Sequence, residues 1–474
     1  MYHILFRITE VVYLITVLGV IVVIISENRN PIKTIAWMMV LIFLPIVGFV
    51  IYVIFGQDFT KRRFMSKRMY SKIKTRPLAE LNSTNFELTD FPSKYTDLVK
   101  LLRNSNQAHL LHGSSVEFYV TGRDKFDALF SDIEKAIDHI HVEYYAWDDD
   151  VVGNLLKDLL IKKSLEGIKI RVIVDGVGSW RVKNSFYEQM RSAGIEVEEF
   201  MKVKFPMFTS HVNYRNHRKI VVIDGRVGYI GGMNVADRYV NGPSWGNWRD
   251  THARIEGKGV QGLQSVFLID WFIVSKSLIT ARRYFPSLKT YGDNFMQIVT
   301  SGPYSPAREI MQGFMQAIFG AQSYIYIQTP YFIPPESLSE ALIAASVRGV
   351  DVRLMVPRKS DTLLVQLASR SYFKKLLRAR IKIYFYEPGF LHSKLMIIDD
   401  SLTLIGSANF DVRSFEQNLE VMAFIYNQET TKQARKIFVD DQKSATAIVL
   451  REWVKRSVWI RFKESFVRLF TPLL

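Results

Sequence analysis

The chain has 474 residues, of which 48% are hydrophobic and 23% are charged. These values are typical of a folded protein with two or three domains and exclude a disordered chain. The sequence contains no cysteine, which excludes disulfide bonds, thiolate nucleophiles and cysteine-held zinc or iron–sulfur sites. The formal net charge of +16 indicates an anionic partner, which is nucleic acid, acidic lipid or phosphate.

Two apolar segments at the start of the chain predict a transmembrane hairpin over residues 1–60. The first span covers about 8–25, and the second covers about 34–55, where the 22 residues Thr34–Phe55 carry no charge. At about 1.5 Å per residue, a helix of this length crosses a hydrocarbon core of about 30 Å. A cleavable signal peptide is the alternative for the first segment, but Ile24–Asn28 lacks the small residues of a cleavage site.

A basic segment follows the predicted hairpin and begins a linker over residues 61–108. Lys61–Arg76 contains eight basic residues and no acidic one. By the positive-inside rule, this flank places the rest of the chain on the cytoplasmic side of the membrane. Positive charge beside apolar spans favours an anionic membrane surface, because a nucleic-acid enzyme more often spreads basic residues along a binding track. We therefore expect a membrane-integrated protein with no nucleic-acid partner.

Residues 110–445 alternate strand-like and helix-like segments, which indicates an α/β fold. The pattern also repeats in the same order. The matching pairs are Ile140–Trp147 with Ile325–Phe332, and Gly167–Val174 with Gly349–Val356. Two copies of one α/β unit explain this repetition better than chance does. We place the first copy over residues 109–290 and the second over residues 291–445.

Each copy ends in the same motif, H-x-K-x4-D-x6-G-[GS]-x-N. Two occurrences in one chain are a strong signal of function. The first motif consists of His217, Lys219, Asp224, Gly232 and Asn234, and the second of His392, Lys394, Asp399, Ser407 and Asn409.

His and Lys two positions apart on a strand point to the same face. Such pairs can act on a phosphodiester, whose transition state spreads negative charge over equatorial oxygens. One neutral imidazole attacks phosphorus in line, while a second, protonated imidazole gives its proton to the leaving oxygen. Lysine ammonium groups neutralise the charge without a metal. Two repeats that meet face to face supply both imidazoles, so we predict one active site between them.

Residues around each motif complete the predicted site. Gly232 and Ser407 lie in stretches where the backbone can approach a phosphate, and Asn234 and Asn409 offer amide donors. Asp250 follows the first motif and Glu420 follows the second, and either carboxylate can hydrogen-bond an imidazole and orient it. The remaining histidines show no ligand spacing, so we expect no metal site.

The C-terminal residues 446–474 predict a basic amphipathic helix. Arg451–Arg468 contains six basic and two acidic residues, between large apolar residues at helical spacing. These apolar residues are Trp453, Val454, Val458, Trp459, Phe462, Phe466, Leu469 and Phe470. The pattern indicates a helix that lies in a membrane interface with its apolar face down. A terminal helix docked on the protein core is the alternative.

The doubled motif resembles that of the phospholipase D superfamily. Within it, the chain is similar to bacterial cardiolipin synthases over nearly its full length. The matching segments are Asn28–Thr34, His141–Tyr145, Trp248–Asp250, Thr329–Pro334 and Asn409–Ser414. The resemblance implies two pseudo-symmetric phospholipase D-like α/β repeats, packed together with the active site between them and preceded by the transmembrane hairpin.

The resemblance also implies a reaction in which two phosphatidylglycerol molecules give cardiolipin and glycerol through a covalent phosphohistidine, with no cofactor. His217 would be the nucleophile and His392 the general acid, although the near symmetry of the halves leaves this order open. Lys219, Lys394, Asn234 and Asn409 would hold the phosphoryl oxygens, and Asp224 and Asp399 would support the geometry of the motif. The expected location is a bacterial cell membrane, crossed more than once.

Other members of the superfamily remain as alternatives. One is a membrane-bound phospholipase D or transphosphatidylase that acts on another phospholipid or alcohol, because the choice between water and a lipid alcohol depends on shape and water exclusion. Another is a nuclease, against which the hairpin and the localised charge argue. The sequence does not determine the oligomeric state.

Overall fold

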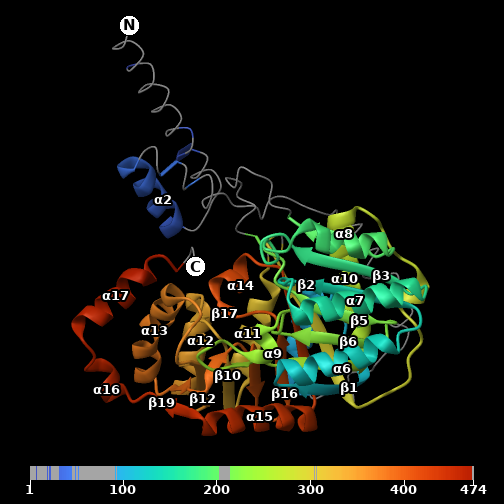
Figure 1. Cartoon of the computed structure of the whole chain (residues 1–474). Helices are drawn as coiled ribbons and strands as arrows, with labels where there is room; N and C mark the ends of the chain where they lie inside the picture. Colours follow the sequence, from blue (N-terminus) through green and yellow to red (C-terminus); the bar gives the residue numbers. More distant parts are fainter. Residues whose placement is uncertain are drawn as a thin grey trace. The chain divides into compact units, whose positions relative to one another are not determined.

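The computed structural model describes residues 31–44, 93–201, 214–303, 305 and 307–471, together with residues 7, 19, 21, 22, 48, 49, 52 and 91. Figure 1 shows their helices and strands. The chain divides into two units, one of Met1–Lys61 with Val203–Tyr214 and one of Arg62–Lys202 with Arg215–Leu474. The second unit contains every strand that the structure describes.

The first unit contains helix α2 (Pro31–Phe43). Its first residue is proline, which fits the first helical position because no backbone N–H is needed there. Most of the predicted span 8–25, most of residues 44–55 and residues 61–90 of the predicted basic linker lie outside the described residues. Among the described residues, no helix combines the length and the apolar content needed to cross a bilayer.

The first half of the second unit alternates strands and helices, as the sequence predicts. Its elements are β1 (Leu111–Tyr119), α6 (Gly122–Glu134), β2 (His139–Tyr144), α7 (Val151–Leu165), β3 (Lys169–Asp175), α8 (Asn184–Ser192), β4 (Glu196–Phe200), β5 (Lys219–Ile223), β6 (Val227–Gly231), α9 (Arg238–Asn241), β7 (Asn247–Arg249), β8 (His252–Gly257) and α10 (Gly259–Ser275). A short 3₁₀ helix, η5 (Arg282–Tyr284), leads to the second half.

The second half repeats this order with small additions. Its elements are β9 (Asn294–Ser301), α11 (Glu309–Gly320), β10 (Tyr324–Gln328), β11 (Phe332–Ile333), α12 (Glu336–Val347), β12 (Asp351–Pro357), α13 (Leu363–Arg378), β13 (Lys382–Tyr386), β14 (Gly389–Leu391), β15 (Leu395–Ile398), β16 (Leu402–Gly406), β17 (Phe410–Asp411), α14 (Val412–Glu416), β18 (Glu420–Tyr426) and α15 (Gln428–Lys443). The predicted fold of two α/β repeats is therefore confirmed.

The two halves form one sheet of fifteen strands whose order shows the internal symmetry. From one edge the strands run β4-β3-β2-β5-β6-β8-β1, and from the other β19-β13-β12-β10-β15-β16-β18-β9. The central strands β1 and β9 pair in antiparallel fashion and join the halves. In each half, three parallel strands adjoin the antiparallel strands that carry the motif. The motif strands β5 and β15 thus take equivalent places.

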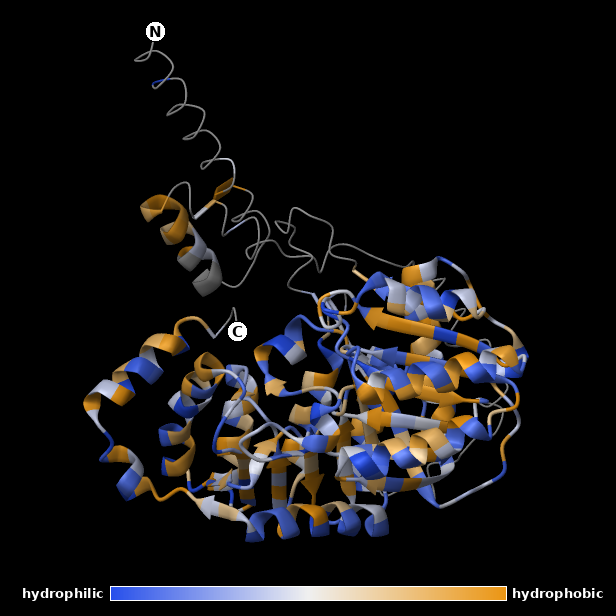
Figure 2. Ribbon diagram, in the orientation of Figure 1, coloured by the Kyte–Doolittle hydropathy of each residue, from blue (hydrophilic) through white to orange (hydrophobic). Residues whose placement is uncertain are grey.

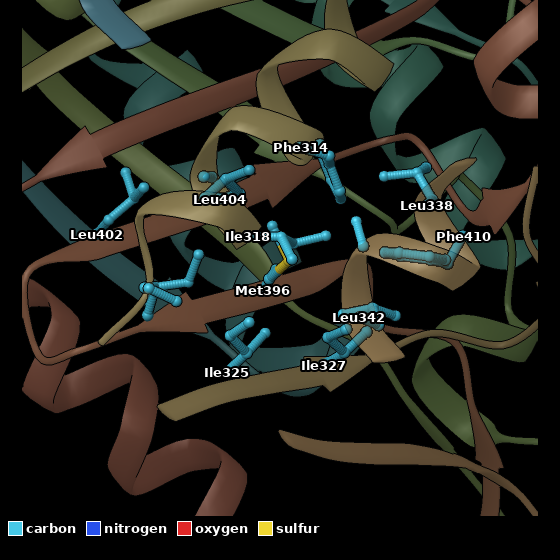
Figure 3. Packing of buried hydrophobic residues seen from close by; sticks show 14 of the residues in the cluster. Phe314, Ile318, Ile325, Ile327, Leu338, Leu342, Met396, Leu402, Leu404 and Phe410 are labelled. Carbon is cyan, nitrogen blue, oxygen red and sulfur yellow. The ribbon is translucent and has the colours of Figure 1, made fainter. Parts of the chain in front are cut away.

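Apolar side chains fill both faces of this sheet. On one face of the second half, Phe314 and Ile318 of α11 and Leu338 of α12 pack over Ile325 and Met396 (Figure 3). A different core joins the halves. It contains Ile220 and Val222 of β5, Ile397 of β15, Leu263 of α10 and Phe438 of α15. Because residues from both halves share this interior, the two motifs are held in one body.

The structure differs from the predicted linker at residues 93–106. These residues form the 3₁₀ helix η3 (Ser93–Tyr95) and helix α5 (Thr96–Asn106). Leu98, Val99 and Leu102 of α5 are buried in the core of the second half. They recur at the three- and four-residue spacing of one helix face, so the segment gains stability by packing and does not behave as a linker.

The predicted C-terminal helix is present as two shorter helices. After the edge strand β19 (Ala445–Ala447), the chain forms α16 (Leu450–Val454) and α17 (Val458–Arg468). The chain turns at Ser457, whose hydroxyl caps α17 by accepting the N–H of Trp459. Trp453 of α16 lies in the core beside Phe373 and Phe385.

The aspartates of the two motifs lie at the ends of β5 and β15 that are farther from His217 and His392, where they hydrogen-bond a neighbouring strand. The Asp224 carboxylate accepts the backbone N–H groups of Ile137, Asp138 and His139 at 2.9, 2.8 and 2.9 Å. Asp399 accepts those of residues 322, 323 and 324 at 2.8, 2.8 and 2.9 Å. Both aspartates adopt a left-handed backbone, with φ of 54° and 52°, which Asp tolerates in a turn. Each therefore ties the β5–β6 or β15–β16 turn to the start of a neighbouring strand.

We predict that Asp224→Ala lowers the free energy of unfolding by about 2–4 kcal/mol, because it removes three charge-assisted hydrogen bonds. Thermal and denaturant unfolding of the full chain in detergent measure the change. Asp127→Ala on the exposed face of α6 is the matched control and should have little effect. Loss of activity in Asp224→Ala without loss of stability would contradict this structural role.

Candidate active site

Backbone pairing across the seam brings the two motifs together. The N–H of His217 donates to the carbonyl of Leu419 at 2.9 Å, and Leu419 donates in turn to Arg215 at 2.8 Å. The N–H of His392 donates to the carbonyl of Arg249 at 2.7 Å, next to the parallel pair β7–β14. Each histidine therefore lies beside a segment of the opposite half, and that segment leads directly to Glu420 or Asp250.

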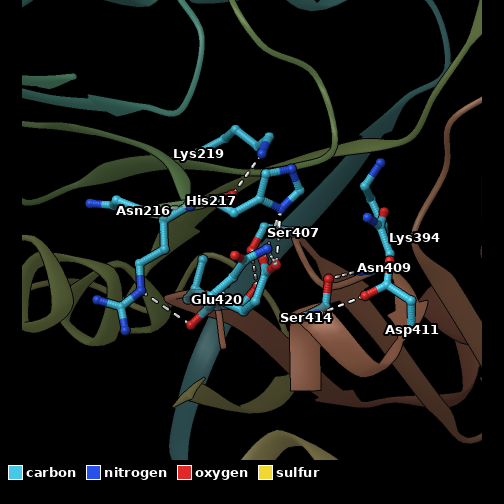
Figure 4. A network of polar contacts seen from close by, with 12 residues as sticks. Asn216, His217, Lys219, Lys394, Ser407, Asn409, Asp411, Ser414 and Glu420 are labelled. Carbon is cyan, nitrogen blue, oxygen red and sulfur yellow. Dashed lines mark hydrogen bonds and ion pairs between the residues drawn. The ribbon is translucent and has the colours of Figure 1, made fainter. Parts of the chain in front are cut away.

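Each histidine is hydrogen-bonded to a carboxylate of the opposite half. The Nδ1 atom of His217 lies 2.9 Å from Oε1 of Glu420 (Figure 4). The Nδ1 atom of His392 lies 2.6 Å from Oδ2 of Asp250. Both carboxylates are fully buried. Because an ionised carboxylate can only accept, each imidazole donates its Nδ1–H, and Nε2 is then the nitrogen that carries the lone pair.

The two lysines are buried beside the imidazoles. The Lys219 ammonium donates to the carbonyl of His217 at 2.6 Å. The Lys394 ammonium donates to the carbonyl of His392 at 2.5 Å and lies 2.9 and 3.0 Å from its two ring nitrogens. Burial, strengthened by the neighbouring lysine, lowers the pKa of Lys219 to about 7. Burial lowers the pKa of Lys394 to about 8.

The imidazoles are neutral in the resting site. Burial, with added repulsion from Lys219 and Lys394, lowers the pKa of His217 to about 4. Burial and the same two lysines lower the pKa of His392 to about 4. Each imidazole thus feels the lysine of the other half, so the four side chains converge on one volume. A phosphodiester anion that enters this volume would raise all four pKa values, because it offsets the positive charge.

The two predicted asparagines differ in what they contact. The Asn234 carboxamide donates to the Tyr239 hydroxyl at 2.6 Å and accepts the N–H of Ala146 at 3.1 Å. Asn409 uses its backbone N–H to donate to the Ser414 hydroxyl at 3.1 Å. Within the part of the chain that the structure describes, the buried Oδ1 atom of Asn409 has no hydrogen-bond partner. Among the residues described, the Asn409 carboxamide oxygen is thus left without a protein partner, whereas both ends of the Asn234 carboxamide are held by the protein.

Gly232 and Ser407 lie against the orienting carboxylates. A Cβ atom on Gly232 would lie 2.1 Å from Oδ1 of Asp250, so this position requires glycine. The Ser407 hydroxyl donates to Oε2 of Glu420. Glu420 is one methylene longer than Asp250, which leaves room for a side chain at position 407. These contacts support the carboxylates, a role that the sequence analysis did not predict for either residue.

The sequence did not predict the buried polar groups that lie behind the histidines and their carboxylates. Arg218, between His217 and Lys219, forms an ion pair with Asp270 of α10 and donates to the carbonyl of Glu420 at 3.1 Å. In the other motif, the Ser393 hydroxyl lies 2.8 Å from that of Thr251. The signal was present in the sequence: the residue between His and Lys must point to the opposite face, where an arginine requires a buried acid.

Aromatic rings line the remaining sides of the histidines. The Tyr145 ring lies 5.1 Å from the His217 ring, and the Lys219 ammonium lies 5.4 Å from the Tyr145 ring. The Trp248 and Phe390 rings lie 5.2 and 5.6 Å from the His392 ring. These rings exclude water and strengthen the electrostatic interactions within the site. In the described residues, no group of three or more His, Asp or Glu side chains is arranged to hold a metal ion.

We predict that affinity for a phosphodiester falls between about pH 7 and pH 9. Lys219 and Lys394 are charged below pKa values of about 7 and 8, and each loses the charge that attracts the anion as the pH rises. Titration with dimethyl phosphate, whose own charge is constant here, should show roughly a tenfold or larger loss. Lys219→Met should weaken binding at pH 6.5 and flatten the dependence, whereas Lys289→Met at an exposed site should not. A pH-independent affinity would contradict the assigned lysine charges.

Comparison with known proteins agrees with this geometry. A family model described as cardiolipin synthase, phospholipase D-like domain matches residues 129–255 and 314–442, one segment in each half. A second model, described as phospholipase D-nuclease N-terminal, matches residues 14–57.

Relatives match nearly the whole chain. The major cardiolipin synthase ClsA of Bacillus subtilis is 39% identical over 98% of both chains. A cardiolipin synthase of Oceanobacillus iheyensis is 41% identical over 95% of this chain and 96% of its own. Among solved structures, phosphatidylserine synthase of Haemophilus influenzae shares the fold with a TM-score of 0.62 at 14% identity, over 80% of this chain and 98% of its own. The chain therefore belongs to the bacterial cardiolipin synthase family of the phospholipase D superfamily.

Proposed function

We propose that the protein is a cardiolipin synthase that transfers a phosphatidyl group from one phosphatidylglycerol to a second and releases glycerol. The observation that carries this proposal is the pair of imidazoles, each held by a buried carboxylate of the opposite half and each with a buried lysine beside it. Such a site supplies a nucleophile, an acid and two cations for a phosphodiester. The similarity to cardiolipin synthases supports the choice of lipid substrate.

In the first half-reaction, Nε2 of His217 attacks phosphorus in line and the bond from phosphorus to the glycerol oxygen breaks. His392 gives its Nε2 proton to that oxygen, so glycerol leaves uncharged. His392 can hold this proton because the bound anion offsets Lys219 and Lys394 and raises the imidazole pKa. The lysines and the carboxamide NH₂ of Asn409 donate to the equatorial oxygens.

In the second half-reaction, the terminal hydroxyl of another phosphatidylglycerol gives its proton to Nε2 of His392. Its oxygen attacks phosphorus and the bond from phosphorus to His217 breaks, which yields cardiolipin and restores the neutral nucleophile. One phosphodiester replaces another, so the cycle needs no nucleotide to drive it. The aromatic rings around the histidines favour the lipid alcohol over water by limiting access.

We further propose that residues 1–60 integrate the protein into the cell membrane as a hairpin, with the catalytic residues on the cytoplasmic side. The uncharged run in residues 34–55 and the eight basic residues of Lys61–Arg76 support this arrangement. The family match over residues 14–57 supports it as well. We retain residues 109–290 and 291–445 as the bounds of the two repeats.

Purified protein given only phosphatidylglycerol with a labelled glycerol headgroup should release one labelled glycerol for each cardiolipin formed. His217→Asn and His392→Asn should each reduce this rate at least about 10³-fold and leave the fold intact, because each removes one partner of a proton-and-phosphoryl transfer. A base-stable, acid-labile phosphatidyl adduct should accumulate on His217 in His392→Asn. An adduct on His392 would show that His392 is the nucleophile and His217 the acid. Phosphatidic acid as the main product would show that the protein is a hydrolase.

Gly232→Ser should reduce the rate about 10²-fold or more, because its side chain would displace the Asp250 carboxylate that orients His392. Ser407→Gly, the reciprocal change, removes one hydrogen bond to Glu420 and should reduce the rate less, by roughly tenfold. Initial rates and thermal unfolding of both variants separate an effect on the site from loss of fold. A Gly232→Ser variant as active as the unchanged protein would refute the assigned contact.

A further inference from the structure

Helix α17 (Val458–Arg468) is docked on the protein by its polar side. Glu464 is buried and receives two hydrogen bonds from Arg456, at 2.7 and 2.9 Å. Val467 is packed with Ile333 of β11 and Ala368 of α13. The inward face of α17 therefore carries this ion pair, the Val467 contact and Arg468, whose guanidinium lies 4.7 Å from the centre of the Tyr372 ring of α13.

The outward face of α17 is aromatic. Trp459, Phe462 and Phe466 are 62%, 55% and 52% exposed, although they are the largest apolar side chains of the helix. Their rings follow one another at centroid distances of 5.5 and 6.3 Å, and Phe470 continues the row at 5.4 Å. Figure 2 shows several turns of α17 coloured as hydrophobic. A helix of a water-soluble surface would turn such a face inward.

The ion pair fixes this unusual orientation. The Arg456 guanidinium lies 3.2 Å from the centre of the Trp453 ring, and Trp453 is anchored in the core of the second half. Rotation of α17 to bury the aromatic row would pull Glu464 away from Arg456 and leave both charges unpaired. Such a rotation is unfavourable because Glu464 would lose its partner in a buried place. The protein therefore keeps its aromatic row directed outward.

Positive charge surrounds the aromatic row. Lys455 and Lys463 are exposed, with the Lys463 ammonium 5.6 Å from the centre of the Trp459 ring. Of the two acidic residues in Arg451–Arg468, Glu464 is buried and paired with Arg456, and Glu452 is exposed on α16. Aromatic rings flanked by lysine and arginine are the surface that an anionic bilayer attracts, since the rings enter the interface and the cations meet the headgroups. We propose that the outward face of α17 binds the surface of an anionic phospholipid bilayer. This inference rests on the proposed function in one respect, which is that the substrate lipid lies in that bilayer.

The docking surface is linked to the active site through short contacts. Val467 of α17 packs on Ile333, and Ile333 pairs with Asp411 of β17, two residues beyond Asn409. Leu363 and Leu364 at the start of α13 are also exposed apolar residues. The helix that meets the bilayer is thus packed on the strand pair that leads to the second motif.

The absence of cysteine allows a single label to test this proposal. In the full chain, Phe462→Cys on α17 and Val347→Cys on α12 each receive an environment-sensitive fluorophore. Val347 is the matched control because it is an apolar residue exposed to 73% on another helix. The labelled proteins are reconstituted in vesicles of phosphatidylglycerol with phosphatidylcholine, some with a quencher on the acyl chain.

We expect blue-shifted emission and strong quenching at position 462 and neither at position 347. Water-like emission at both positions would overturn the proposal. A blue shift at position 462 that appears in detergent without phospholipid and grows with protein concentration would also overturn it, in favour of a second copy of the chain as the occupant.

A rate measurement separates this inference from the proposed function. Phe462→Ser/Phe466→Ser changes exposed residues only and should leave turnover of dispersed short-chain phosphatidylglycerol unchanged, while turnover of vesicle phosphatidylglycerol falls about tenfold. Equal turnover of vesicles by this variant and the unchanged protein would overturn the docking role. If the unchanged protein makes no cardiolipin from either substrate, the proposed function fails, while the fluorescence result still decides the membrane contact.

Discussion

The hydrogen bonds between backbone segments of the two halves determine what each half contributes to the site. The residue before Glu420 pairs with the segment that ends at His217, and the residue before Asp250 pairs with the backbone of His392. Each imidazole consequently meets a carboxylate of the opposite half. A half on its own would bury a carboxylate without the imidazole that satisfies it, at a cost of several kcal/mol. The duplication is therefore required for a stable site as well as for two-histidine chemistry.

The charges inside the site are balanced without a substrate. Two lysines face two carboxylates, and burial keeps the imidazoles neutral. This balance allows four ionisable groups to be buried together, because an unpaired charge in the same place would be far more costly. Because the resting site is balanced, binding of a charged substrate changes the pKa values of its groups. A phosphodiester adds one negative charge, which raises the pKa values of the lysines and the imidazoles together; Lys219, whose pKa is about 7, becomes fully charged first, and the imidazoles become easier to protonate.

The repeat and the motif could be read from the sequence because each depends on a local pattern. Alternating strands and helices recur in order, and His-x-Lys before four apolar residues fixes a strand end with both side chains on one face. The exchange of Asp250 and Glu420 could not be predicted, since it depends on how the halves pair. The contacts of Gly232 and Ser407 and the ion pair of Arg218 follow from that pairing. The helix at residues 96–106 was missed because a nearby basic segment dominated the composition of the predicted linker.

The two halves differ in the residues that hold the carboxylates. His and Lys are the same in both motifs, but glycine supports Asp250 where serine supports Glu420, and Arg218 is replaced by Ser393. Both imidazole pKa values are lowered to about 4 in the resting site, so any difference between the two imidazoles has to arise when an anion binds. Substitution of a histidine or lysine of the motif would abolish the reaction, whereas substitution of a residue that contacts a carboxylate changes only how the imidazole is oriented. The asymmetry thus lies around the carboxylates that orient the imidazoles, while the histidines and lysines of the two motifs are the same.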